Sequence, residues 1–334
     1  MKYKNLGNTN EKLSVIGLGC MGMSSAYGEA DEKENIATLH YALELGINFW
    51  DTADIYGNGK NEELISKVIK EKRDKIFIAT KFGFRMRNGV GEVFSGDSYI
   101  DGSPKYIKQA VEESLKRLKI ETIDLYYAHR VDPLIPIEET VAAMADLVKE
   151  GKVRYLGLSE CSPESLKKAH AIHPISALQS EYSLLTRDVE KELLPLTREL
   201  GITMIPFSPL GRGLVTNKLN IDGIKSGDFR KNQPRYNGEY LKNNQQLAEE
   251  IAAFAVNRNA TSAQLALAWL LAKSDNIIPI PGTKRRKYLE ENAGAVDMIL
   301  TEEDIKKIEE MLEKYPNIGP RYSEREFKFL DNQH

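Results

Sequence analysis

The feature that most constrains this chain is a regular alternation between short apolar runs and longer amphipathic segments. Apolar runs bounded by glycine or polar residues are typical of buried strands, whereas the longer segments repeat their apolar residues at the spacing of a helix. Eight such pairs follow one another in the 334 residues without a central break. This order predicts an α/β fold, a (β/α)8 TIM barrel, and we expect residues 1–334 to form a single domain.

The same pattern places the expected strands and helices. An N-terminal β-hairpin is expected because turn residues at 6–10 separate two strand-like runs. Barrel strands are expected over residues 15–19, 47–51, 75–82, 123–128, 153–158, 175–179, 202–207 and 277–280. The helices between them should begin near residues 31, 61, 103, 136, 162, 188 and 286, with extra helices over 242–256, 261–271 and 301–313.

Local signals mark some helix ends. Asp31 followed by Glu34 predicts a capping box, in which each side chain bonds the other residue's backbone N–H. Pro104 after Ser103 predicts a helix start, because the first helical position leaves its N–H unpaired anyway. Pro195 lies inside the helix expected over 188–200 and predicts a kink there, because proline removes an internal hydrogen bond.

Two long polar segments, residues 85–102 and 211–240, follow the third and seventh expected strands. Loops beyond about 12 residues are uncommon in compact folds unless they have a function. Both segments would leave the same end of the barrel, so we expect them to be lids over a substrate. The tail, residues 315–334, carries aromatic residues but little periodic pattern.

Composition and termini exclude several kinds of partner. A net charge of −3 gives no basic field for nucleic acid. No apolar run approaches the ~20 residues that a membrane span needs, and residues 1–5 lack the apolar core of a signal peptide. Cys20 and Cys161 lack metal-ligand spacing, which argues against a zinc site or a disulfide framework and favours a cytoplasmic protein. We therefore expect a small-molecule substrate and no metal, while the oligomeric state stays open.

Side chains suited to proton transfer fall at the ends of three consecutive expected strands. Asp51 closes the second strand, and Tyr56 lies in the loop just beyond it. Lys81 and His129 follow at the ends of the third and fourth strands. Because ligands and catalytic groups gather at the carboxyl ends of parallel strands, these four side chains indicate a proton-transfer site.

Two short motifs point elsewhere and are set aside. Residues 17–22 fit the G-x-G-x-x-G pattern of a Rossmann fold, but that pattern should open directly into a helix, and the helix here is expected only from residue 31. A tight barrel loop near a ligand is favoured. Residues 56–60 fit Y-x-x-x-K, which short-chain dehydrogenases place on one helix face. Gly57 and Gly59 would each cost such a helix roughly 1 kcal/mol, so Lys60 is rejected as a catalytic lysine.

The chain resembles the aldo-keto reductases over nearly its whole length. The resemblance lies in residues 46–53 (GINFWDTA), 206–211 (PFSPLG), 281–283 (PGT) and 291–295 (ENAGA). Asp51, Tyr56, Lys81 and His129 stand in the register of that family's catalytic tetrad. Residues 157–160 and 179–183 are similar to the perakine reductase and auxin-induced-protein branch. The resemblance implies the reduction of aldehydes or ketones to alcohols.

The implied roles agree with elementary acid–base chemistry. Tyr56 would protonate the carbonyl oxygen, although a phenol with a pKa of about 10 is a reluctant acid near neutral pH. Lys81 would stabilise the phenolate, and Asp51 would pair with Lys81 and hold it in place. His129 would donate to the carbonyl oxygen and orient it.

The resemblance also implies a nicotinamide dinucleotide, NADP(H), bound at the barrel mouth without a Rossmann domain. Phe207 would lie under the nicotinamide ring, and Ser159 and Gln179 would bond its carboxamide beside Glu160, where the family often has Asn. Glu291 and Asn292 would hold the adenine. Lys284 would face the 2′-phosphate, or else begin a solvated helix. Further implied contacts are Cys20, Met21, Asp51, Ser208, Pro209, Leu210, Gly211, Arg212, Gly213, Lys218, Gly282, Thr283 and Tyr288.

A second class stays open on the sequence. Potassium-channel β subunits share this fold, cofactor and tetrad but serve chiefly as regulators, so the tetrad does not separate them from reductases. If the protein is an enzyme, its substrate is set by loops, which the sequence does not define. Five aromatic residues in these regions suggest apolar carbonyl compounds: Tyr27, Phe84, Tyr236, Tyr240 and Tyr322.

Overall fold

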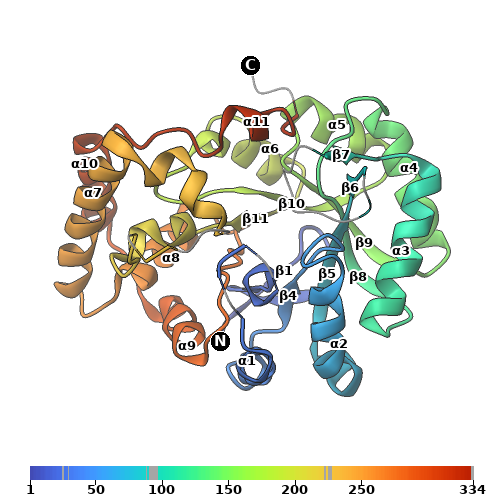
Figure 1. The fold of residues 1–334 in the computed structure, drawn as a ribbon, viewed down its shortest axis with the longest axis horizontal. Coiled ribbons are helices and arrows are strands. Elements are labelled where there is room, and N and C mark those ends of the chain that lie inside the picture. Colours follow the sequence, from blue (N-terminus) through green and yellow to red (C-terminus); the bar gives the residue numbers. More distant parts are fainter. Residues whose placement is uncertain are drawn as a thin grey trace.

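A computed structural model describes residues 1–24, 26–28, 30–87, 89, 97–221, 223–224 and 228–331 of the chain. Parallel strands form a nearly closed barrel with helices around it, which confirms the predicted α/β barrel (Figure 1). The sheet has seven strands in the order β11-β10-β9-β8-β5-β4-β3. Their bounds are Leu18–Gly19 for β3, Phe49–Asp51 for β4, Phe77–Phe82 for β5, Ile123–Ala128 for β8, Val153–Ser159 for β9, Ile175–Glu181 for β10 and Thr203–Phe207 for β11.

The eighth expected strand, residues 277–280, closes the barrel but is irregular. Isolated parallel bridges join it and Gly282 to β11 and β3. Its alternate N–H groups donate to carbonyls of β11 at 3.0 Å, whereas Pro279 and Pro281 have no N–H to offer on the β3 side. There the segment only accepts, from Gly17 at 2.9 Å and Gly19 at 3.3 Å. The two prolines therefore account for the incomplete strand.

Helices cover the outside of the barrel, and the additional α7, α8 and α10 lie together at one side (Figure 1). Most of the remaining helices alternate with the strands as the sequence predicts, whereas the short α11 in the tail was not predicted. Helix bounds are Glu32–Glu44 for α1, Lys60–Lys72 for α2, Pro104–Leu118 for α3, Ile137–Lys149 for α4, Pro163–Ile172 for α5, Leu193–Glu199 for α6, Gly238–Val256 for α7, Ser262–Lys273 for α8, Arg286–Ala293 for α9, Glu302–Lys314 for α10 and Glu324–Phe327 for α11.

Two local predictions about helices are wrong. Asp31 caps α1 by accepting from the N–H groups of Lys33 and Glu34, but the Glu34 carboxylate bonds Arg286 of α9 and completes no capping box. The helix expected over 188–200 is divided into a 3-10 turn, Asp188–Glu190, and α6. Pro195 therefore lies in the first turn of α6, where its missing N–H has no internal partner to lose, and no kink is needed.

Two hairpins flank the barrel. Strands β1 (Tyr3–Asn5) and β2 (Lys12–Ser14) pair antiparallel, as predicted for the N-terminus. Strands β6 (Phe84–Met86) and β7 (Ser98–Ile100) also pair antiparallel and organise the first candidate lid. Residues 88 and 90–96 of that lid, 222 and 225–227 of the second, and 332–334 of the tail lie outside the described part of the chain.

The apolar core has two layers. Inside the barrel, residues from several strands pack together, including Phe49, Leu125, Tyr127, Ile205 and Ile278. A larger layer fills the space between the strands and the helices. In the described ranges, no helix combines the length and the apolar character that crossing a bilayer requires. These two layers pack against both faces of the strands, whose ends carry the candidate site.

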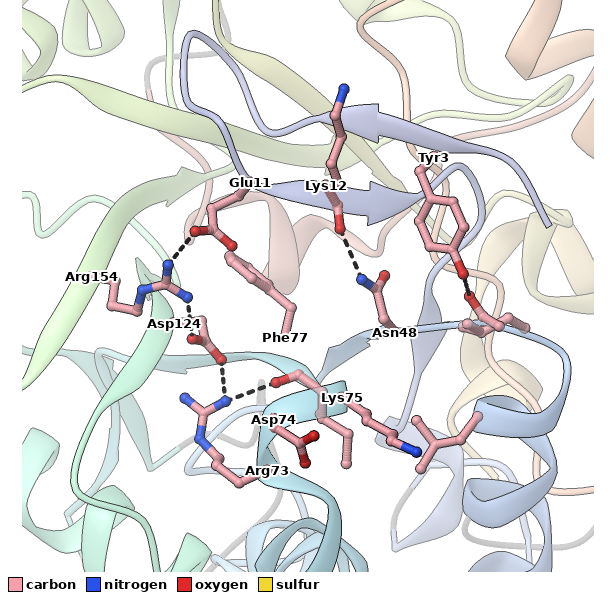
Figure 2. Close-up of a pocket in the computed structure, with 14 residues that line it drawn as sticks. Tyr3, Glu11, Lys12, Asn48, Arg73, Asp74, Lys75, Phe77, Asp124 and Arg154 are labelled. Atoms are coloured by element: carbon pink, nitrogen blue, oxygen red, sulfur yellow. Dashed lines mark hydrogen bonds and ion pairs between the residues drawn. The ribbon is translucent and has the colours of Figure 1, made fainter.

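A cavity of about 600 Å³ opens at the amino ends of the strands, under the N-terminal hairpin (Figure 2). Four of its charged groups pair with one another: Asp124 pairs with Arg73 and Arg154, both at 2.9 Å, and Arg154 also pairs with Glu11. Asn48 donates to the backbone carbonyl of Lys12 at 2.8 Å and ties the hairpin down. None of the predicted site residues lines this cavity, so we assign it to the packing of the barrel base.

Candidate active site

The four proton-transfer residues meet at the opposite end of the barrel. Asp51 is the last residue of β4, Lys81 lies near the end of β5, and His129 directly follows β8. These strands are neighbours in the sheet, with Asp51 paired to Ala79 and Lys81 paired to Tyr127. Adjacent parallel strands in this register bring their carboxyl ends together, so the sequence prediction of a shared site agrees with the geometry.

Lys81 is the centre of the cluster. Its ammonium is fully buried and lies 2.5 Å from Asp51 Oδ1, 2.8 Å from the Thr52 carbonyl and 3.4 Å from Tyr56 Oη. The other carboxylate oxygen of Asp51 accepts from the Gln179 amide at 2.8 Å. One buried cation thus contacts both the acid and the phenol.

The electrostatics of the cluster follow from burial and from these contacts. Burial opposes the charge on Lys81, but Asp51 and Tyr56 outweigh it and raise the pKa of the ammonium, which stays protonated. Burial also raises the pKa of Tyr56, while the charge on Lys81 acts in the opposite direction. The net direction at Tyr56 is upward, so its phenol holds its proton until a stronger base develops beside it.

His129 is an uncharged imidazole. Burial, followed by the positive charges of Lys81 and Arg130, lowers the pKa of His129 well below its usual value. The ring meets Tyr56 edge-on at 5.9 Å between centroids and Phe84 edge-on at 4.9 Å. Within the described ranges its Nδ1 has no hydrogen-bond partner. A neutral ring carries one N–H, which it can donate to a bound oxygen.

The loop that carries Tyr56 is fixed by one buried amide. Asn61 accepts from the Thr52 hydroxyl at 2.6 Å and donates to the Cys20 carbonyl and the Ser24 hydroxyl, both at 2.8 Å. Helix α2 begins only at Lys60, after Gly59 at a left-handed φ of 87°. Tyr56 and Lys60 therefore share no helix face, which agrees with the rejection of Lys60.

The loop after β11 is suited to phosphate. Backbone φ is left-handed at Ser208 (48°), Gly211 (57°), Arg212 (54°) and Gly213 (97°). Loops wound in this way form concave anion sites from backbone N–H groups. The cations Arg212, Lys218 and Lys284 lie on this and neighbouring segments, and such a donor set fits the phosphates of a dinucleotide.

Several implied cofactor residues are engaged with protein groups. Arg212 pairs with buried Glu181 at 2.6 Å, and Lys218 pairs with Glu291 of α9 at 2.9 Å. Lys284 donates to the carbonyl of Tyr27 at 2.8 Å and to that of Gly28 at 3.3 Å. These contacts tie Tyr27 and Gly28, the loop after β11, and α9 with Lys284 before it together at the barrel end.

The remaining implied contacts belong to the same end of the barrel or to α9. Ser159 and Gln179 lie near the ends of β9 and β10, and Phe207 ends β11. Cys20 follows β3, and its N–H donates to the Asp51 carbonyl at 2.9 Å. The others group by position: Met21 after Cys20; Ser208, Pro209, Leu210, Gly211 and Gly213 after β11; Gly282 and Thr283 after the closing segment; and Tyr288 and Asn292 on α9.

Glu160 has a role of its own. It adopts a left-handed φ of 54°, and its carboxylate accepts from the Glu181 N–H at 2.7 Å and pairs with Arg321 of the tail at 2.7 Å. Burial opposes ionisation of Glu160, but Arg321 and Arg130 outweigh it and lower its pKa. The acid at this position therefore holds the tail against the barrel mouth.

Three nearby residues were missed by sequence reasoning: Arg130, Arg321 and Phe329. Arg130 could have been found, because it follows His129 at the same strand end. Nothing in the irregular tail indicated that Phe329 would pack on Phe84, with ring centroids 5.7 Å apart. Of the aromatics named for the pocket, Tyr236 instead donates its hydroxyl to the Gly211 and Arg212 carbonyls.

A barrel that brings an acid, a lysine, a phenol and an imidazole together at its carboxyl end, beside a loop suited to phosphate, defines a class of cofactor-dependent oxidoreductase. Comparison with known proteins makes the class specific. The model of the aldo/keto reductase family matches residues 15–313. The chain belongs to the aldo/keto reductase family.

Relatives support this assignment over nearly the full length. The chain is 46% identical over 319 residues to probable aldo-keto reductase 1 of Glycine max, covering 95% of this chain and 90% of the relative. It is 43% identical over 319 residues to the aldo-keto reductase yakc [NADP(+)] of Schizosaccharomyces pombe, covering 94% and 92%. The perakine reductase branch inferred from the sequence stays a prediction.

Solved structures are similar in fold. The glycerol dehydrogenase AKR11B4 from Gluconobacter oxydans matches with a TM-score of 0.85 at 29% identity, covering 96% of this chain and 97% of that one. The aldo-keto reductase AKR11C1 from Bacillus halodurans, in its holo form, matches with a TM-score of 0.77 at 31% identity, covering 93% and 96%. The barrel architecture is therefore that of other aldo-keto reductases.

Proposed function

We propose that this protein reduces aldehydes or ketones to alcohols with NADPH and that Tyr56 is the proton donor. The observation that carries the proposal is the buried contact of one ammonium, that of Lys81, with both Asp51 and Tyr56. The Schizosaccharomyces pombe relative, which is named for NADP(+), supports the choice of cofactor. The free, buried thiols of Cys20 and Cys161 support a cytoplasmic location. The single-domain organisation stays a prediction.

The residues divide the work as follows. The bound cofactor would supply a hydride to the carbonyl carbon, which leaves an electron pair on the carbonyl oxygen. Tyr56 Oη gives its proton to that oxygen, and the adjacent Lys81 ammonium stabilises the phenolate left behind. Asp51 holds Lys81 in place, and the neutral His129 ring donates its N–H to the same oxygen and orients it.

The cofactor would lie along the loop after β11. The left-handed backbone at 208–213 and Arg212 would hold the pyrophosphate, and Ser159 and Gln179 would bond the carboxamide above Phe207. Lys284 would meet the 2′-phosphate, and Glu291 and Asn292 the adenine. For the substrate, the apolar cluster of Phe84, Ile100 and Phe329 beside His129 supports carbonyl compounds with an apolar group.

The test is NADPH oxidation, followed by absorbance, across a panel of aldehydes and ketones. Wild type should turn over repeatedly. Tyr56→Phe should bind NADPH normally but lose a factor of about 10² to 10⁴ in kcat, because a positioned acid contributes that much. Tyr155→Phe is the matched control, since its hydroxyl contacts Glu11 near the barrel base. Near-normal turnover by Tyr56→Phe contradicts the proton donor, and single slow turnover by wild type with every substrate favours a regulatory subunit.

A further inference from the structure

Arg130 lies directly behind the catalytic imidazole, although it belongs to none of the roles assigned above. It is 4% exposed and follows His129 at the end of β8. Its Nη1 donates to the His129 backbone carbonyl at 2.6 Å and to Ser159 Oγ at 3.4 Å. One guanidinium thus joins the ends of β8 and β9, which carry the proposed orienting group and a proposed carboxamide contact.

The same guanidinium supports the ring that packs on His129. The Arg130 Cζ lies 5.6 Å from the centroid of Phe84, within the range of a cation–π contact. Phe84 in turn meets the imidazole nearly perpendicularly, at 86° and 4.9 Å. The His129 ring therefore packs edge-on against both Phe84 and Tyr56. Its backbone N–H is also fixed, donating to the Phe82 carbonyl at 2.8 Å.

From this arrangement we propose that Arg130 is a positioning residue for carbonyl reduction, which acts by aiming His129. The proposal rests on the reductase function proposed above. Arg130 acts through His129 and contacts no reacting atom in the scheme.

Charge and geometry act together here. The charged and titratable groups that act on or contact His129 include Lys81 on β5, Arg130 just after β8 and Tyr56 on the loop after β4. Lys81 is neutralised by Asp51, whereas Arg130 acts electrostatically on Glu160, whose carboxylate pairs with Arg321 at the mouth. Burial is the largest cause that lowers the pKa of His129, followed by Lys81 and then by Arg130, so removing the Arg130 charge should reverse part of that shift and let the imidazole take up a proton at higher pH.

The experiment compares Arg130→Gln, which removes the charge, with Arg130→Lys, which keeps it. Kinetics give kcat, KM and the dissociation constant of NADPH. The chain has five histidines, so the pH titration of His129 can be followed by NMR on labelled imidazole carbons, assigned by its loss in His129→Asn. Arg154→Gln at the barrel base is the matched control for loss of a guanidinium.

We expect Arg130→Gln to lower kcat by about tenfold or more, since a small misplacement of a catalytic group can cost about 10²-fold. The NADPH dissociation constant should change less than about twofold, and the His129 titration should move to higher pH. Arg130→Lys should keep the wild-type titration while recovering only part of kcat, because an ammonium cannot reproduce the guanidinium fork.

An unchanged kcat in Arg130→Gln would overturn the proposal, and so would a fall in kcat without movement of the titration, because packing alone would then explain it. A titration that moves equally in Arg130→Lys would also overturn the assignment to charge. Failure of the proposed reductase function can be told apart from failure of the Arg130 proposal. In the first case wild type would turn over no carbonyl substrate, while the His129 titrations would remain measurable.

Discussion

Lys81→Met should separate the stability of the site from its chemistry. Methionine fills a similar apolar volume but removes the ammonium that lies 2.5 Å from Asp51 and 2.8 Å from the Thr52 carbonyl. Asp51, which is 3% exposed, would then be a buried carboxylate that keeps, among the described residues, the hydrogen bond from the Gln179 amide. Breaking a buried pair by removing one partner costs about 3–5 kcal/mol. For a chain of this size we expect Tm to fall by roughly 4–7 °C.

The double variant Asp51→Asn/Lys81→Met tests the origin of that loss. The neutral amide introduced at position 51 can still accept from Gln179, so most of the lost stability should return. Turnover should not return, because the cation beside Tyr56 is absent in both variants; we expect losses on the order of 10² to 10⁴. Thermal unfolding followed by circular dichroism gives Tm, and NADPH oxidation gives the rate.

The pH dependence sharpens the test. Burial raises the pKa of Asp51, and in Lys81→Met no ammonium opposes that effect. A carboxyl whose pKa is raised in the folded state destabilises that state only when it is ionised. The loss of unfolding free energy in Lys81→Met should therefore be complete near pH 8 and should shrink as the pH falls. Equal Tm values for wild type and Lys81→Met at pH 8 would refute the reasoning.

Two further substitutions probe the rest of the site. His129→Ala should lower kcat for several carbonyl substrates while leaving the NADPH dissociation constant within about twofold, as binding measurements and kinetics will show; unchanged kinetics would exclude an orienting role. Lys284→Ala should raise the NADPH dissociation constant by about one to two decades and hardly change that of NADH, because a charge-assisted phosphate contact contributes roughly 1.5–3 kcal/mol. Since Lys284 also bonds the carbonyls of Tyr27 and Gly28, equal losses for both cofactors would mean that it acts only through that loop. Arg285→Ala is the neighbouring control.

The barrel and the proton-transfer cluster were predictable because both depend on local pattern. Strand ends are marked by where an apolar run stops, and the parallel register then brings Asp51, Lys81 and His129 together. Contacts between distant segments carry no such signal. The pairing of Glu160 with Arg321 and of Lys284 with the loop at Tyr27 depends on how irregular segments fold over the barrel.

Local rules also failed where tertiary contacts offered a better partner. Glu34 was expected to complete a capping box, but Arg286 on the neighbouring α9 binds its carboxylate instead. Pro195 was expected to bend a helix, whereas the chain starts a new helix just before it. The prolines of the closing segment removed donors from a strand that was placed correctly but is irregular.

The closure of the barrel by residues 277–282 affects the protein while it is being made. Gly19 pairs with Gly282, which is synthesised much later in the chain. At about 5–20 residues per second, the ribosome needs roughly ten seconds to a minute to reach Gly282 after Gly19. During that interval β3 is a free sheet edge, to which strands of other nascent chains could add. Its length of two residues offers little to pair with, and the prolines of its eventual partner make that segment a poor strand for any other edge.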